Sequence, residues 1–221
     1  MRHGTKVVAL VGGHLLRGAD GTFRTSTFDD YDNPYGEFGD RIRSEAAALL
    51  YRQSPRDTSI MVLGGVTPLH KTVPEAPHLS AVIKGELIAL GVPEEQIEEI
   101  DLDPACGTYQ QLAHLARRVR EVCVSVGIDE LAILASLWQF PRMFAMIHFR
   151  DELAEVLLQD RPRVRYVAAE EIVTDDDPKR YAEIAAACRR SERLACLRGE
   201  LKGAWMVAEG TYKFPTTFPN R

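Results

Sequence analysis

The sequence predicts an α/β protein, a Rossmann-like doubly wound parallel sheet of about five strands with helices on both faces. Short apolar runs alternate along the chain with longer segments of helical period, the pattern of buried parallel strands joined by helices. Two of these runs, residues 6–11 and 59–63, end at glycine pairs, Gly12 with Gly13 and Gly64 with Gly65. Ligands of such sheets bind outside the carboxyl ends of the strands, so we expect both pairs to border one binding site.

The first strand is followed by a long polar segment, residues 15–39, which we expect to form a functional loop. Asp40 stands where it can cap the next helix, which continues to about residue 53. The apolar positions at helical spacing in this helix are Ile42, Ala46, Leu49 and Leu50. The second strand comes next, and a loop that contains His70 and His78 follows it.

The helix predicted over residues 80–90 should end at Gly91, because a glycine with a proline just beyond it is a frequent helix C-terminus. Residues 97–102 are expected to form the third strand. Thr108 and Gln111 match a capping box, in which two side chains satisfy free amides at a helix start. The apolar stripe of this helix is Leu112, Leu115, Val119, Val122 and Val126, and Gly127 should end it.

Two further strands are predicted at residues 131–135 and 164–168. Between them, Pro141 suits the first turn of another helix. The acidic stretch 170–177 is expected to be a loop, its last three aspartates complementing the dipole of a long helix that Pro178 opens. The chain from Gly203 onward carries no predicted element.

Composition restricts the class of protein. With 221 residues, 45% of them hydrophobic and 27% charged, we expect one soluble domain over residues 1–221. The net charge of −5 argues against a nucleic acid as partner, because that needs a concentrated basic surface. No apolar run is long enough for a membrane span and no signal peptide is visible, so we expect a cytoplasmic protein with no membrane contact. A homo-oligomer stays open as an alternative.

The cysteine pattern indicates reduced thiols. The chain has four cysteines and no Cys-x-x-Cys pair, so neither a zinc site nor a disulfide framework is expected. They are Cys106, Cys123, Cys188 and Cys196. We expect them to be small buried side chains, with Cys106 the candidate for an exposed loop thiol.

An ordered series of motifs covers residues 6 to about 150. In chain order they are Gly12-Gly13, Asp40-Arg41, Val62-Leu63-Gly64-Gly65, Leu90-Gly91-Val92-Pro93, Gly107-Thr108 and Trp138-Gln139-Phe140-Pro141-Arg142. The series resembles the bacterial ElyC/SanA/YdcF family, and without membrane segments the chain is more similar to the soluble YdcF-like branch. The resemblance implies a Rossmann-like sheet with a nucleotide-sized pocket and S-adenosylmethionine as the ligand, residues 160–221 completing the domain. Gln139 stands where that family has a histidine.

The expected ligand contacts lie at the strand ends and in these motifs. They are Gly12, Gly13, Arg41, Gly64, Gly65, Thr108, Gln111, Trp138, Gln139 and Arg142. The guanidinium of Arg142 suits a carboxylate or phosphate, the alternative being an ion pair within the protein. The ring of Trp138 could stack on adenine while Gln139 binds the edge of the base. The ring of Phe140, in the same turn, could also stack on the base, with packing in the core as the alternative.

Three residues are candidates for catalysis. His14 and His70 each follow a glycine pair closely and could serve as a general base or a phosphate contact, the alternative being ordinary surface histidines. Asp101, at the end of the third strand, could accept hydrogen bonds from a ribose diol. Two groups of acidic residues could instead bind a divalent metal through their carboxylate oxygens. The other interpretation is that they lie in solvated turns. These groups are Asp29, Asp30 and Asp32 in the polar loop, and Asp101 with Asp103.

The favoured function is binding of an adenosine-type small molecule, S-adenosylmethionine above all, at the carboxyl ends of the strands. Such a protein could act as a transferase or hydrolase on a small metabolite. A metal-dependent hydrolase or transferase of a nucleotide or sugar phosphate, using Asp30, Asp32 or Asp101, is the first alternative. A noncatalytic ligand-binding or interaction protein is the second, because glutamine at position 139 cannot shuttle protons as histidine does.

Overall fold

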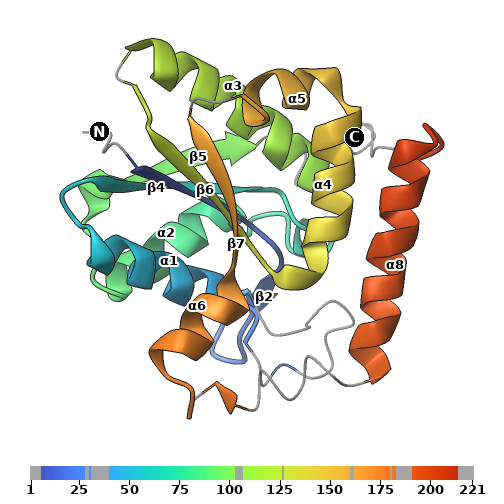
Figure 1. Cartoon of the computed structure of the whole chain (residues 1–221). Helices are drawn as coiled ribbons and strands as arrows, with labels where there is room; N and C mark the ends of the chain where they lie inside the picture. Colours follow the sequence, from blue (N-terminus) through green and yellow to red (C-terminus); the bar gives the residue numbers. More distant parts are fainter. Residues whose placement is uncertain are drawn as a thin grey trace.

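A five-stranded parallel sheet forms the centre of the protein, with helices on both faces (Figure 1). The computed structural model describes residues 6–27, 30, 40–102, 107–125, 127–159, 162–179, 181–182 and 191–213. The strands are β1 (Lys6–Val11), β4 (Thr58–Gly65), β5 (Ile97–Leu102), β6 (Glu130–Ala135) and β7 (Arg163–Ala168). The predicted α/β fold is confirmed.

The strand order β5-β4-β1-β6-β7 contains one reversal of direction. From β1 the chain moves outward to β4 and β5, and then crosses back to place β6 against the free side of β1. Val11 lies opposite Leu63 of β4, and Leu10 lies opposite Leu134 of β6. The carboxyl ends of β1 and β6 therefore flank the point at which ligands of doubly wound sheets bind.

Helices α1 (Arg41–Gln53), α2 (Leu79–Ala89) and α6 (Ala169–Asp176) cover one face of the sheet (Figure 1). Alternate residues of the central strands, such as Val8 and Leu10 of β1, are buried against them. All eight residues of β4 are buried, because β4 is covered on both faces.

The opposite face is covered by α3 (Thr108–Ser125), α4 (Phe140–Phe149) and α5 (Asp151–Leu157). The predicted stripe of α3 is confirmed over its described positions, which are fully buried: Leu112, Leu115, Val119 and Val122. Val126 lies outside the described residues. The last described helix, α8 (Ser191–Ala208), packs outside α4, as Figure 1 shows.

Helix ends follow the glycine signals. Gly91 and Gly127 have φ values of +88° and +82°, a backbone conformation that side chains with a Cβ rarely adopt. Both lie just beyond the helix that each was expected to end. Pro141 lies in the first turn of α4, as predicted.

Two expectations about loops are wrong. The polar segment after β1 contains an antiparallel hairpin, β2 (Leu15–Arg17) with β3 (Phe23–Thr25), whose strands are too short for periodicity to reveal them. The acidic stretch 170–177 is mostly the helix α6, which buries Val173 and packs against α1. Packing of one apolar face can stabilise a helix that contains several carboxylates. The aspartates at 175 and 176 are the last two residues of α6.

The C-terminal region also differs from the expectation. Residues 178 and 179 form a turn, and residues 183–190 of the long helix expected after Pro178 lie outside the described residues. Helix α8 continues through Gly203, where no element was predicted. Among the cysteines, Cys123 is a half-buried free thiol whose pKa is raised by burial, whereas the side chains of Cys106, Cys188 and Cys196 lie outside the described residues.

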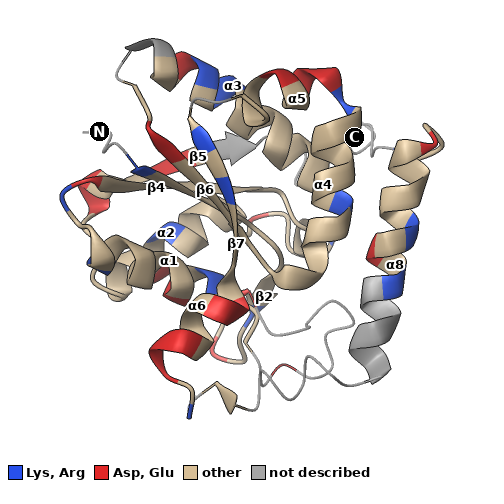
Figure 2. Ribbon diagram, in the orientation of Figure 1, with Lys and Arg blue, Asp and Glu red and all other residues tan. Residues whose placement is uncertain are grey.

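Charged residues of both signs are distributed over the helices and strand ends, and acidic residues gather on α6 (Figure 2). In the part of the chain that the structure describes, no helix is both long enough and apolar enough to cross a membrane.

Candidate functional site

A buried arginine of α1 joins the carboxyl ends of β1 and β6. Arg43 is 2% exposed, and its guanidinium donates to the Val11 carbonyl at 2.7 Å and to the Ser136 hydroxyl at 3.1 Å. The same group forms an ion pair of 2.6 Å with Asp40. Arg43 therefore holds together the two strand ends that flank the reversal, and nothing local in the sequence distinguished it from Arg41.

Asp40 is the N-cap residue of α1, as predicted, but its side chain makes no capping hydrogen bond. Its carboxylate accepts the backbone N–H of His14 and pairs with Arg43, and it lies so close to Gly13 that an added Cβ would overlap it. In dinucleotide-binding folds, a phosphate occupies this position beyond the first strand. The protein fills the position with its own carboxylate.

At Gly12 and Gly64, neighbouring atoms pack so closely against the backbone that a Cβ would not fit without a shift. A Cβ on Gly12 would overlap the Leu63 carbonyl oxygen and lie 2.8 Å from Leu79, and a Cβ on Gly64 would lie 3.2 Å from the Ser80 nitrogen. These glycines let the N-terminus of α2 approach the ends of β1 and β4. Gly65 is the buried last residue of β4.

Gln111 bonds to the backbone at the exit of β1. Its amide oxygen accepts the Gly12 N–H at 2.9 Å, and its amide nitrogen donates to the Gly12 carbonyl at 3.3 Å. The predicted capping box is therefore wrong, and Thr108 is the first residue of α3 itself. The Gly12 N–H also donates to the Leu63 carbonyl of β4 at 2.9 Å, so Gln111 adds a second acceptor for this N–H and a donor for the Gly12 carbonyl.

The turn after β6 is built in a similar way. Gln139 is 5% exposed, and its side-chain oxygen accepts the Ser136 N–H at 3.2 Å within η3 (Leu137–Gln139). Trp138 is half-buried against the core on the α1 face. Phe140 is buried in the core, which was the alternative prediction for this residue, and its ring centroid lies 5.6 Å from that of Phe144.

Glu170 is a buried carboxyl group at this edge that the sequence analysis did not identify. One oxygen accepts the Leu137 N–H at 3.0 Å, and the other, Oε1, is buried and makes no hydrogen bond among the described residues. Burial raises the pKa of this carboxyl group above its ordinary value of 4.5, and the backbone amides of Glu170 and Leu137, the Arg43 charge and the Ser136 hydroxyl oppose the rise only in part. Glu170 was not identified from the sequence because the acidic composition of residues 170–177 predicted a loop there.

Replacing this carboxyl group predicts a specific pH dependence. The folded protein binds the Glu170 proton more tightly than the unfolded chain does. The stability that this proton contributes is therefore complete below pH 4.5 and is lost as the pH rises through the raised pKa of Glu170. Glu170→Gln should therefore gain stability relative to the wild type as pH increases from 4.5 to 8. Urea unfolding at several pH values measures this difference, with the exposed neighbour Glu171→Gln as matched control. A difference that stays constant or shrinks with pH contradicts the prediction.

Arg142 lies on the α3 side of the sheet. Its Nε is 3.0 Å from a carboxylate oxygen of Glu200 on α8, and its Nη2 is 3.5 Å from the Thr108 hydroxyl. This is the ion pair within the protein that stood as the alternative to an anionic ligand. The partner lies 58 positions along the chain, so no local pattern indicated it.

Arg41 belongs to a second buried network, on the α2 side. Its guanidinium lies 3.1 Å from Glu86, which also accepts the Thr25 N–H at 2.9 Å and the Ser44 hydroxyl at 2.8 Å. The network fastens the β2–β3 hairpin to α1 and α2. Arg41 is about three-quarters buried there.

The two histidines occupy different surroundings. His14 has a 30% exposed side chain whose Nδ1 lies 3.9 Å from Asp40. Burial lowers the pKa of His14, and the nearby Asp40 carboxylate opposes this shift. His70 is buried in η1 (Pro68–Lys71), after β4.

The acidic candidates for a metal are mostly not described. Asp30 is held by Arg24 at 2.6 and 2.7 Å, and the hydrogen bond from Arg24 keeps the pKa of that carboxyl group well below its usual range. Asp101 lies opposite Gly64 in the sheet, and its side chain is outside the described residues. The same is true of Asp29, Asp32 and Asp103. Among the residues that are described, no three His, Cys, Asp or Glu side chains are grouped to hold a metal.

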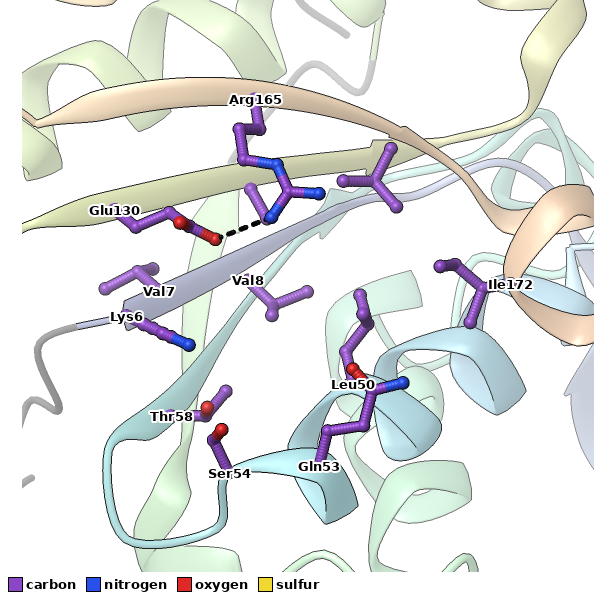
Figure 3. A pocket seen from close by; sticks show the side chains of 12 residues that line it. Lys6, Val7, Val8, Leu50, Gln53, Ser54, Thr58, Glu130, Arg165 and Ile172 are labelled. Carbon is purple, nitrogen blue, oxygen red and sulfur yellow. Dashed lines mark hydrogen bonds and ion pairs between the residues drawn. The ribbon is translucent and has the colours of Figure 1, made fainter. Parts of the chain in front are cut away.

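A cavity of about 100 Å³ lies at the opposite edge of the sheet, near the amino ends of β1, β4 and β6 (Figure 3). Its wall includes Leu50 and Gln53 at the end of α1, Ile172 of α6, and Arg165, which donates to Glu130 at 3.1 Å. No residue of the predicted site lines it.

The structure thus brings Gly12, Gly13 and His14 to the same edge as the turn that contains Trp138 and Gln139. It places Arg41 and Arg142 on opposite sides of the sheet, each against a buried carboxylate. No family model, curated protein or solved structure matches this chain. The function is therefore inferred from the site itself.

Proposed function

We propose that the protein binds a nucleoside-type small molecule, S-adenosylmethionine being the favoured ligand, at the carboxyl ends of β1 and β6. The observation that carries this proposal is the reversal of strand order between them, where ligands of doubly wound sheets bind. Arg43 and Asp40 bond the strand ends at this edge to one another and to α1. His14, Trp138 and Glu170 supply side chains beside it.

The chemistry of this edge selects against a pyrophosphate. Asp40 already occupies the position beyond β1 at which the phosphates of a dinucleotide would bind, and a second anion there would be repelled. A ligand with a positive sulfonium and no phosphate meets no such repulsion. The unpartnered Oε1 of Glu170 can accept a hydrogen bond from a ribose hydroxyl or an amino group, and the Trp138 ring can cover a base.

We also propose membership of the YdcF-like branch, a bacterial origin and a cytoplasmic location, which the resemblance of the motifs supports. Binding rather than proton transfer is the chemistry we assign to the turn after β6, because the amide of Gln139 is bonded to the backbone. The metal-dependent alternative is less well supported, since Arg24 and Thr27 already bind the carboxylate of Asp30.

Thermal unfolding tests the proposal directly. A ligand at 100 times its dissociation constant adds about 2.7 kcal/mol to stability, which raises the Tm of a domain of this size by about 5 to 10 °C. We expect such a rise with S-adenosylmethionine and with adenosine analogues. A rise that requires both Mg²⁺ or Mn²⁺ and a phosphate compound would instead support the metal-dependent alternative and overturn ours.

A matched pair of tryptophan variants locates the site. Trp138→Leu keeps apolar packing but removes the flat ring, so it should abolish most of the ligand-induced rise in Tm. Trp205→Leu, on the outer surface of α8 where the side chain is 67% exposed, should leave the rise unchanged. Equal responses of the two variants would place the ligand elsewhere.

A further inference from the structure

The N-terminus of α2 is buried at the carboxyl end of β4, beside the second glycine pair. Leu79 and Ser80 are 0% and 1% exposed, and the Ser80 nitrogen lies close to Gly64. The backbone amides of Leu79, Ser80 and Ala81 make no hydrogen bond within the described part of the chain, and the first turn contains no acidic residue. N-terminal helix amides without protein acceptors are characteristic of anion sites.

His70, whose ring lies beside the N-cap residue of α2, supplies an independent indication of a ligand. Its Nδ1 accepts the Thr67 N–H at 3.0 Å, so the neutral ring carries its proton on Nε2. His70 is 8% exposed, and Nε2 is buried with no hydrogen-bond partner in the described residues. The centroid of the His70 ring lies 6.1 Å from that of His78, the N-cap residue that precedes α2.

From these observations we infer that Nε2 of His70 and the N-terminal amides of α2 form a site for an anionic group of the bound ligand. Nε2 of His70 and the backbone amides at the start of α2 are all hydrogen-bond donors, and the helix dipole adds partial positive charge. A carboxylate or a phosphate satisfies them, whereas a cation or an apolar group does not.

This inference rests on the proposed function, because the anionic group belongs to the same ligand. β4 and β6 lie on either side of β1, so their ends are about 10 Å apart, two strand spacings. A nucleoside with a short anionic tail spans that distance. Asp40 excludes the tail from the exit of β1 and leaves the end of α2 to receive it.

Calorimetric titration of paired ligands tests the anion site. S-adenosylhomocysteine and 5′-methylthioadenosine share the adenosine thioether, but only the first has a carboxylate. AMP and adenosine form the corresponding pair for phosphate. In one of the two pairs, we expect the wild type to bind the anionic ligand at least about tenfold more tightly than the uncharged one. This is the size of effect expected for hydrogen bonds to a charged group.

The variant His70→Asn removes the Nε2 donor, while its side-chain oxygen can still accept the Thr67 N–H. We expect it to lose the preference for the anionic ligand and to keep its affinity for the uncharged one. His148→Asn, on the exposed end of α4, is the matched control and should bind as the wild type does. Thermal unfolding without ligand confirms that both variants are folded.

The outcomes separate the anion site from the proposed function. Loss of the preference in His70→Asn alone supports the site, and the pair that responds identifies carboxylate or phosphate. Equal affinities within both pairs, or a preference that survives in His70→Asn, overturn the site while nucleoside binding stands. If no nucleoside binds, but methionine or inorganic phosphate binds the wild type and not His70→Asn, the anion site stands and the proposed function fails.

Discussion

Replacing Arg43 with methionine is expected to lower the free energy of unfolding by about 3 to 5 kcal/mol, the cost of leaving a buried charge unpaired. Asp40, 7% exposed, would lose its ion pair, and the Val11 carbonyl and Ser136 hydroxyl would lose their donor. Urea unfolding monitored by circular dichroism measures the change, which corresponds to a fall in Tm of about 10 °C.

The control for this variant is Arg120→Met. Arg120 is 61% exposed and lies 3.5 Å from Glu155, which is itself 68% exposed. Exposed pairs of this kind contribute about 1 kcal/mol or less. The double variant Asp40→Asn with Arg43→Met should recover part of the loss, because no unpaired charge is then buried. An Arg43→Met protein within about 1 kcal/mol of the wild type would show that the buried pair does not hold the strand ends together.

The second large effect is expected for Gly12→Ala, which should destabilise the protein by about 3 kcal/mol or more. The new methyl group would overlap the Leu63 carbonyl oxygen, which belongs to the β1–β4 pairing and cannot move away without disturbing it. Leu79, 2.8 Å from the added carbon, is fully buried. Thermal and urea unfolding at neutral pH measure the loss.

Gly85→Ala is the matched control, the same chemical change in the interior of α2. No atom lies within 4 Å of the added Cβ, and alanine favours a helix over glycine by about 0.5 to 1 kcal/mol. We therefore expect Gly85→Ala to stabilise the protein. If both variants change stability alike, close packing is not the reason for glycine at position 12.

The fold could be predicted because its signals are local. Burial on both faces requires continuous apolar runs in the central strands, and the bounds of β5 agree with the expectation. Burial on one face gives α3 its stripe, and Gly91 ends its helix as expected. The hairpin was missed because each of its strands has three residues, too few for a period.

Much less of the candidate site could be predicted. Arg41 and Arg43 lie in one turn of α1, yet Arg41 faces Glu86, whereas Arg43 faces the strand ends. Gln111 was identified as a site residue, but its contact with Gly12 spans 99 positions. Glu170 was not identified, because its hydrogen bond is to Leu137, 33 positions away in the chain.

By itself, the sequence determined the strands of the sheet, most of its helices and the edge at which its glycine pairs lie, because hydrophobic burial and backbone conformation leave patterns within a few residues. Only the tertiary structure decided what those glycines accommodate, namely the Asp40 carboxylate at Gly13 and the start of α2 at Gly12 and Gly64. It also decided which arginine is bonded to both strand ends. Partners of buried polar groups are selected by distance and desolvation in space, and these depend on segments far apart in the chain.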